Sequence, residues 1–157
     1  MIKQLLIGAV VIILLLGGLL WYLSQGIEDV SLERVSLEGI SEITTESLTI
    51  QGSLYLHNPS NLPVPVDNIT YDVLIGDAQE KIGTGVIQGF LLAPQTTTQT
   101  MLDQEIFYES TTRAAINLLR GDADTITVQG TIYVDLEVHT QKISFEEQTS
   151  IQEQLTQ

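Results

Sequence analysis

The sequence predicts an all-β protein: an antiparallel β-sandwich of the immunoglobulin or fibronectin III type, with about seven strands and one short α-helix, preceded by one transmembrane helix. Three observations carry this prediction. Most of the chain after residue 30 alternates apolar and polar residues, which is typical of sheets with one buried face. Turn-forming residues interrupt this alternation at short intervals. The N-terminal segment, in contrast, is apolar on every side.

The composition is strongly acidic. The 157 residues include 20 acidic and 6 basic side chains, a formal net charge of −14. Such a surface repels nucleic acid and anionic lipid headgroups, so neither is an expected partner of the folded domain. The chain has no cysteine, which excludes disulfides and thiolate sites.

The N-terminal apolar segment, residues 5–23, contains no charged side chain. As a helix it would be about 29 Å long, close to the hydrocarbon thickness of a bilayer. Trp21 and Tyr22 lie at its far end, where amphipathic rings favour the membrane interface. Lys3 precedes it, so we expect residues 1–4 in the cytoplasm and the domain outside, as in a single-pass membrane protein.

A cleaved signal peptide is the rival interpretation, with Ser24 and Gly26 as small residues before the cut. The apolar segment is longer than a signal peptide needs, which favours a retained signal anchor. A retained anchor would leave residues 24–29 as the linker and hold the domain within about 20 Å of the membrane.

The first predicted strand covers residues 30–40. Its alternation slips one place at Glu33 and Arg34, which indicates a β-bulge. The next strand, 47–57, alternates cleanly and places Gly52 on its apolar face. The apolar side chains on that face are Leu48, Ile50, Leu54 and Leu56.

The segment 56–66 contains three of the four prolines, Pro59, Pro63 and Pro65. Proline fixes φ and has no N–H to donate, so these residues are not expected within an interior strand ladder. We interpret the segment as a rigid corner, opened by Asn58, between two extended strands.

A strand at 69–75 follows, and Gly76 begins a turn into another strand at 81–92. Gly83, Gly85 and Gly89 weaken the latter strand and indicate a bulge or a close backbone approach. The side chains expected to share one face of it are Ile82, Thr84, Val86 and Phe90.

The Thr-rich segment 95–107 predicts a further strand, with Leu102 and Ile106 in phase. Residues 109–120 form the only helix we expect in the domain, and Gly121 ends it. Its N-terminal cap is Ser110 or Thr111, and its apolar face comprises Ala115, Ile116, Leu118 and Leu119.

The strand at 124–138 contains a repeat. Residues 127–134 resemble residues 49–56, and each copy places glycine on the apolar face and tyrosine on the polar face. We interpret the two strands as occupying equivalent places in a sandwich. The tyrosines, Tyr55 and Tyr133, either form a docking surface or pack against cross-strand neighbours.

The last predicted strand contains Ile143 and Phe145, and Val138 is the final core-facing position of the strand before it. The sandwich domain is therefore expected to cover residues 30–148. The polar residues 149–157 are expected to form a flexible tail.

The corner and the strands after it resemble the late embryogenesis abundant type 2 family, which overlaps the water-stress and hypersensitive-response domain. The resemblance covers most of the domain, from about Val30 to Phe145. The family motif is carried by Asn58, Pro59, Pro63, Pro65, Tyr71, Gly83 and Gly85.

No pattern in the sequence predicts a metal or cofactor site. His57 and His139 both fall on the polar faces of predicted strands, and a zinc site would need both with added carboxylates. The segment Asp122–Asp124 resembles part of a calcium loop but lacks the later ligands and the closing glutamate. A polar turn after the helix explains it better.

No catalytic residues are predicted either, so we expect a protein that is not an enzyme. Asp103 with Glu105, and Asp135 with Glu137, share strand faces, but with 20 acids such pairs arise by chance. Asn68 begins an N-glycosylation pattern, which matters only if the domain is extracytoplasmic.

The resemblance implies a role in desiccation or other stress tolerance, in which a stable, acidic sandwich shields proteins or the membrane surface. Two alternatives stay open. The domain could be an envelope adaptor that docks a protein partner by adding a strand at an exposed edge. It could also handle lipid in a groove between its sheets.

Overall fold

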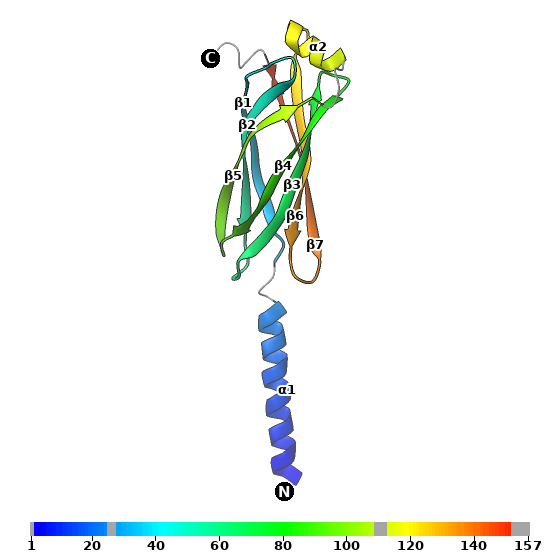
Figure 1. Cartoon of the computed structure of the whole chain (residues 1–157). Coiled ribbons are helices and arrows are strands. Elements are labelled where there is room, and N and C mark those ends of the chain that lie inside the picture. The colour runs from blue at the N-terminus through cyan, green and yellow to red at the C-terminus, as the bar shows by residue number, and fades with distance from the viewer. Residues whose placement is uncertain (1, 25–27, 109–112, 152–157) are drawn as a thin grey trace.

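The structure, a computed structural model, describes residues 2–24, 28–108 and 113–151, with side chains for 10–21, 28–108 and 116–151. The described residues form two α-helices and seven β-strands (Figure 1). In chain order they are α1 (Ile2–Ser24), β1 (Ser31–Ser41), β2 (Ser47–Asn58), β3 (Val64–Ile75), β4 (Glu80–Leu92), β5 (Thr96–Phe107), α2 (Arg113–Arg120), β6 (Thr125–Asp135) and β7 (Thr140–Ser150).

The seven strands of the described chain form two antiparallel sheets, in the orders β1-β2-β5 and β4-β3-β6-β7. The sheets face each other as two layers of an elongated sandwich (Figure 1). At its sides β4 lies beside β5 and β1 lies beside β7. The predicted antiparallel β architecture with one short helix is confirmed. The two repeated segments lie in β2 and β6, which are interior strands of different sheets, as their equivalence predicts.

The core fills the space between the sheets with aliphatic side chains from every strand. The alternation in β2 is confirmed, because its four apolar residues are fully buried. Removing such side chains from water is the main favourable term in folding. Other side chains with no exposed surface include Ile69, Val73, Ile82, Leu92, Leu102, Ile126, Val128, Ile132 and Val134.

The first strand has the expected bulge and a second one. Its pairing with β2 shifts between Leu32 and Arg34, at the position predicted, and again between Leu37 and Gly39. Bulges twist an edge strand and interrupt its row of pairing groups.

The strand after the corner starts earlier than the alternation predicts. β3 begins at Val64, so Pro65 lies inside a strand whose later residues pair on both sides. Pro65 is opposite Leu91 of β4, and pairing with β6 begins only at Val66. The proline is tolerated because it sits at the strand end, before the second ladder starts.

The expected buried face of β4 is wrong at Thr84 and Val86, whereas Ile82 is buried and Phe90 packs against the core. Val86 is 44% exposed and Thr84 is also exposed, whereas Gly83 and Gly85 lie on the core side. The register between β3 and β4 shifts beside Val73, so Gly83 and the residues just after it face the opposite side of the sheet from the side predicted. Glycine takes the core positions because side chains from other strands already fill the space above them.

The described part of the domain's helix buries fewer apolar side chains than predicted. The described helix α2 begins at Arg113, and the proposed caps lie outside the described residues. Leu118 is buried, but Ile116 and Leu119 are 37% and 43% exposed, so the expected four-residue apolar face is wrong for these two. The side chain of Ala115 lies outside the described residues.

The predicted end of the helix is confirmed. Gly121 has a φ of +73°, and its N–H donates to the Leu118 carbonyl at 3.2 Å. The Asp122 N–H donates to the Asn117 carbonyl at 2.9 Å. This pair of bonds closes the helix as a Schellman motif, which needs a left-handed residue where Gly121 stands.

The predicted strand 124–138 is too long. β6 ends at Asp135, and Val138 is 78% exposed in the turn to β7, instead of facing the core. His139 and Glu137 also lie in this turn, and Glu137 has a φ of +65°. The alternation of apolar and polar residues continues into the turn by coincidence, because a turn residue need not point toward either face of the sheet.

The last strand is longer than predicted. β7 continues to Ser150, and Ile151 is buried with its N–H bonded to the Asp124 carbonyl at 2.9 Å. The sandwich therefore extends past residue 148. The rest of the predicted tail, residues 152–157, lies outside the described residues.

The N-terminal helix α1 extends from the end of the sandwich at which β1 begins (Figure 1). Its described side chains, from Val10 to Trp21, are all exposed. Within the described part of the chain, no helix qualifies as long and apolar enough to cross a membrane.

Candidate functional site

The Asn-Pro corner is organised by the Asn58 side chain, which is completely buried. Its Nδ2 lies 2.8 Å from the Leu62 carbonyl and 3.2 and 3.3 Å from the carbonyls of Leu92 and Ala93. Its Oδ1 accepts the Ser60 N–H at 3.0 Å. One side chain therefore joins the β2–β3 corner to the β4–β5 corner. The Leu62 and Ala93 carbonyls also accept the hydroxyls of Ser60 and Thr96.

Further bonds reinforce the same junction. The Ser60 side chain is buried, and its hydroxyl donates to Asn58 Oδ1 at 2.6 Å. The Ser60 carbonyl accepts the Gln95 N–H at 3.1 Å. Gln95 Nε2 donates to Asn61 Oδ1 at 2.7 Å. The two corners form one rigid unit at the end of the sandwich where β1 begins.

Tyr71 is the second centre of the motif. Its ring is buried between the sheets, opposite Gly85 of β4 and Gly130 of β6 in the two ladders. A Cβ on Gly85 would overlap the ring, and one on Gly130 would come within 2.7 Å of Tyr71 Cβ. Burial raises the pKa of the Tyr71 hydroxyl from 10.0 to about 12.

The Tyr71 hydroxyl connects the two sheets through Gln104. It donates to Gln104 Oε1 at 2.6 Å, and Gln104 Nε2 donates to the Val86 carbonyl at 2.7 Å. Gly83 permits the close approach of β4 and β5 here, since a Cβ on it would overlap Ile106. The motif residues Tyr71, Gly83 and Gly85 therefore all serve the packing of one seam.

Gln141 closes the opposite seam. Its Oε1 accepts the Val30 N–H and its Nε2 donates to the Val30 carbonyl, both at 2.9 Å. The Gln141 side-chain amide thus pairs with the backbone of Val30, the residue before β1, as a neighbouring strand would. Sequence reasoning missed Gln104 and Gln141, because glutamine in an alternating strand carries no signal of its partner.

Tyr55 and Tyr133 do not form one docking surface. They lie on strands of different sheets and on the outer face of each, so the sandwich core separates them. The Arg34 guanidinium lies 4.4 Å from the Tyr55 ring centre, and the Lys142 ammonium lies 5.8 Å from that of Tyr133. Each tyrosine packs against its cross-strand partner, and a docking role for either face stays a prediction.

Asn68, the potential glycosylation site, lies within β3 between Gln88 of β4 and Tyr133 of β6. Its Oδ1 is buried and has no hydrogen-bond partner among the described residues. Modification of Asn68 stays a prediction.

The carboxylate pairs differ in their surroundings. Asp103 and Glu105 are exposed on β5, where Glu105 Oε1 accepts the Ser47 hydroxyl at 2.6 Å. Asp135 and Glu137 do not share a strand face as predicted, because Glu137 lies in the turn, where its N–H donates to Asp135 Oδ1 at 2.9 Å. One carboxylate of each pair, that of Glu105 and that of Asp135, accepts a hydrogen bond.

A polar groove of about 590 Å³ crosses the outer face of the four-stranded sheet. Asp72 lies in it and forms an ion pair of 3.1 Å with Lys81, and Thr84 donates to the same carboxylate at 2.9 Å. The other lining residues include Thr70, Gln129, Thr131, Ser144, Phe145 and Glu146.

A smaller pocket of about 230 Å³ lies where α2 meets the β3–β4 turn. Its acidic lining residues are Asp77, Glu80, Asp122 and Asp124. No group of three or more metal-ligating side chains with the geometry to hold an ion occurs in the described part of the chain. His57, near Glu33 at 3.8 Å, and His139 belong to separate elements at the end where β1 begins.

The chain matches no known protein-family profile. No curated protein is significantly similar to it in sequence. Among solved structures, it is similar to a protein from Archaeoglobus fulgidus, with 16% identity, a TM-score of 0.56, and coverage of 76% of this chain and 95% of the other. It is also similar to AT1g01470 from Arabidopsis thaliana, with 17% identity, a TM-score of 0.54, and coverage of 79% and 85%. At these identities the two likenesses establish the β-sandwich architecture and nothing about activity.

Proposed function

We propose that this chain is a membrane-anchored member of the late embryogenesis abundant type 2 group, with a physical and non-enzymatic role in protecting membrane or protein during water loss. Its sandwich is of the fibronectin III type. Its N-terminal helix α1 is the anchor, and the domain lies on the extracytoplasmic side.

The observation that carries the proposal is the structural use of four residues of the motif. Asn58 joins two corners, Tyr71 fills the space over Gly85, and Gly83 lets two strands approach. Motif residues that pack inside the domain stabilise the fold, and their side chains are not exposed for contact with a substrate. A stable acidic body that keeps its hydration shell is the property that protection on drying requires.

The anchor is supported by the sequence of the N-terminal segment. Its residues 5–23 carry no charged side chain, and such a segment is long enough as a helix to match the hydrocarbon thickness of a bilayer. Lys3 lies at its N-terminal end and Glu28 follows it, which favours the domain on the outside.

The adaptor alternative needs a free strand edge, and β1, β4, β5 and β7 each pair with a strand on one side only. A single side-chain amide crosses each seam, from Gln141 to Val30 and from Gln104 to Val86. Lipid in a groove between the sheets needs room there, and fully buried aliphatic side chains occupy that space. The two pockets described above lie outside it.

The test is dye retention by dried vesicles. The full chain is reconstituted into phosphatidylcholine vesicles that contain a self-quenching dye, and the vesicles are dried and rehydrated. We expect severalfold more dye to remain than in vesicles without protein. Retention equal to that of protein-free vesicles would overturn the protective role.

A matched control is the Asn58→Ala chain, which keeps the charge and the anchor but loosens the corner. It should protect less than the native chain at equal density in the bilayer. Capture of one stoichiometric protein partner from the envelope, with no gain in dye retention, would favour the adaptor instead.

A further inference from the structure

Three exposed apolar side chains gather at the end of the sandwich where β1 begins. Leu62 in the β2–β3 corner, Leu91 at the end of β4 and Val138 in the β6–β7 turn are 52%, 63% and 78% exposed. The strand registers place these loops at one end, because His57, Leu92 and Asp135 pair near the starts of β1, β3 and β7. We call these three residues the proximal rim.

The backbone holds the rim side chains outward. The Leu62 carbonyl is fixed by Asn58 Nδ2, and Leu91 precedes Leu92, whose carbonyl lies 3.2 Å from the same nitrogen. In the turn, the Val138 N–H donates to the Leu136 carbonyl at 2.7 Å, and the Leu136 N–H donates to the His139 carbonyl at 3.1 Å. These bonds fix the backbone of the loops that carry the three exposed side chains.

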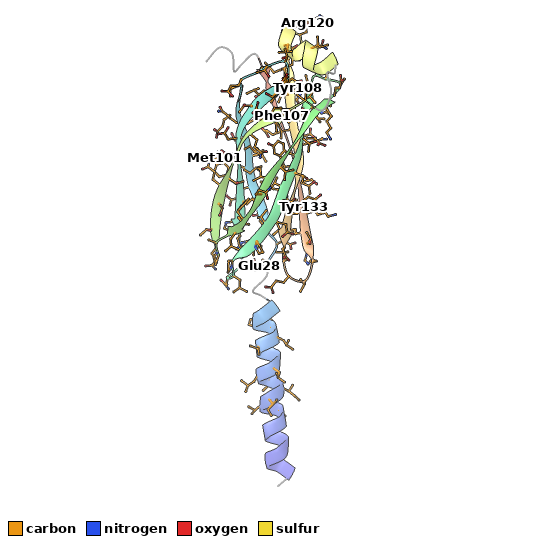
Figure 2. All side chains as sticks on the ribbon, in the orientation of Figure 1. Glu28, Met101, Phe107, Tyr108, Arg120 and Tyr133 are labelled. Carbon is orange, nitrogen blue, oxygen red and sulfur yellow. The ribbon has the colours of Figure 1, made fainter. Side chains whose placement is uncertain are left out.

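The chain leads directly from this end to α1. Glu28 lies at the same end of the domain, and Arg120 lies at the opposite end (Figure 2). Only residues 25–27 separate Ser24 of α1 from Glu28, so the two ends are at most about 14 Å apart. If α1 occupies a bilayer, the rim faces the headgroup layer.

We propose that the proximal rim inserts into the interfacial layer of the bilayer that holds α1, as a second contact between the domain and the membrane. This inference rests on the proposed anchor. Insertion removes three apolar side chains from water and fixes the orientation of the sandwich. The rim is bordered by the exposed acids Glu28, Asp29 and Glu137, so the favoured surface is zwitterionic and not anionic.

The absence of native cysteine allows a direct test with the full chain. Leu62→Cys, Leu91→Cys and Val138→Cys are labelled with an environment-sensitive fluorophore and reconstituted into phosphatidylcholine vesicles with nitroxide-bearing lipid. Matched controls are Met101→Cys on an outer sheet face and Leu119→Cys on α2, which are 69% and 43% exposed. All five positions are exposed in the native domain, so the substitutions should leave folding intact.

We expect blue-shifted emission and severalfold stronger nitroxide quenching at the three rim positions than at the two controls. Replacing half of the lipid with phosphatidylglycerol should reduce this difference. Chains that float with the vesicles but show equal quenching at rim and control positions would overturn the rim contact and leave the anchor standing. Chains that do not float would overturn the anchor, and the rim contact with it.

Discussion

Tyr71 of β3 lies against Gly85 of β4, and the tyrosine ring occupies the space that a side chain on Gly85 would need. The ring also reaches across to the other sheet through its hydroxyl, which donates to Gln104. The Tyr71 ring therefore fills the space over Gly85 of β4, and the Tyr71 hydroxyl connects the two sheets.

Gly85→Ala should destabilise the domain by about 2–3 kcal/mol, because the new methyl group overlaps the buried ring and forces it from its position. Urea unfolding of the full chain in detergent measures the loss. In a Tyr71→Ala background the same substitution should cost much less, since the ring is gone. Val86→Ala, at an exposed neighbour, should change little. Equal costs in both backgrounds would contradict this account.

Stability should fall as pH rises from 10 toward 12. Burial raises the pKa of Tyr71 to about 12, whereas the unfolded chain loses this proton near pH 10. Its contribution is complete below pH 10 and is lost through the folded pKa, a total of about 3 kcal/mol. Burial also raises the pKa of Tyr108, which adds to the same trend.

The Tyr71→Phe variant identifies the group responsible for this alkaline loss. Between pH 10 and 12, the unfolding free energy of this variant should fall less steeply with pH than that of the native chain. At pH 8 it should be less stable by about 1–2 kcal/mol, because Gln104 Oε1 loses its donor. An unchanged slope would assign the alkaline loss to other groups.

Asn58→Ala should cost about 2–4 kcal/mol of unfolding free energy, because the buried amide that joins the two corners is removed and the buried Ser60 N–H loses its acceptor. Asn61→Ala is the matched control in the same corner. It removes one exposed bond to Gln95 and should cost less than about 0.5 kcal/mol. If the two variants were equally stable, the Asn58 amide would not hold the corner.

Gln141→Ala should open the seam between β1 and β7. The Val30 amide loses its acceptor, so its hydrogen exchange should accelerate, and global stability should fall by about 1–2 kcal/mol. Gln88→Ala serves as the control, because β4 is the opposite edge strand of the sheet that contains Gln141, and it should leave Val30 protected. Unchanged exchange at Val30 in Gln141→Ala would show that another group protects it.

Local patterns determined much of this fold. The buried face of β2, the bulge at Glu33, the end of α2 at Gly121 and the extended corner after Asn58 could all be predicted, because each follows from alternation, glycine or proline within a few residues. The matching Gly and Tyr positions of β2 and β6 also predicted that the two strands occupy equivalent places, and both are interior strands of their sheets.

Only the tertiary structure decided the features that depend on distant partners. Gly83 and Gly85 face the core because Ile106 and Tyr71, from other strands, fill the space above them. Asn58 acts through carbonyls 34 and 35 residues away, and Gln141 acts through Val30, 111 residues away. A residue's own neighbours in the sequence specify its backbone preference and its face, whereas the atoms that satisfy a buried polar group or exclude a side chain are set by how the sheets pack.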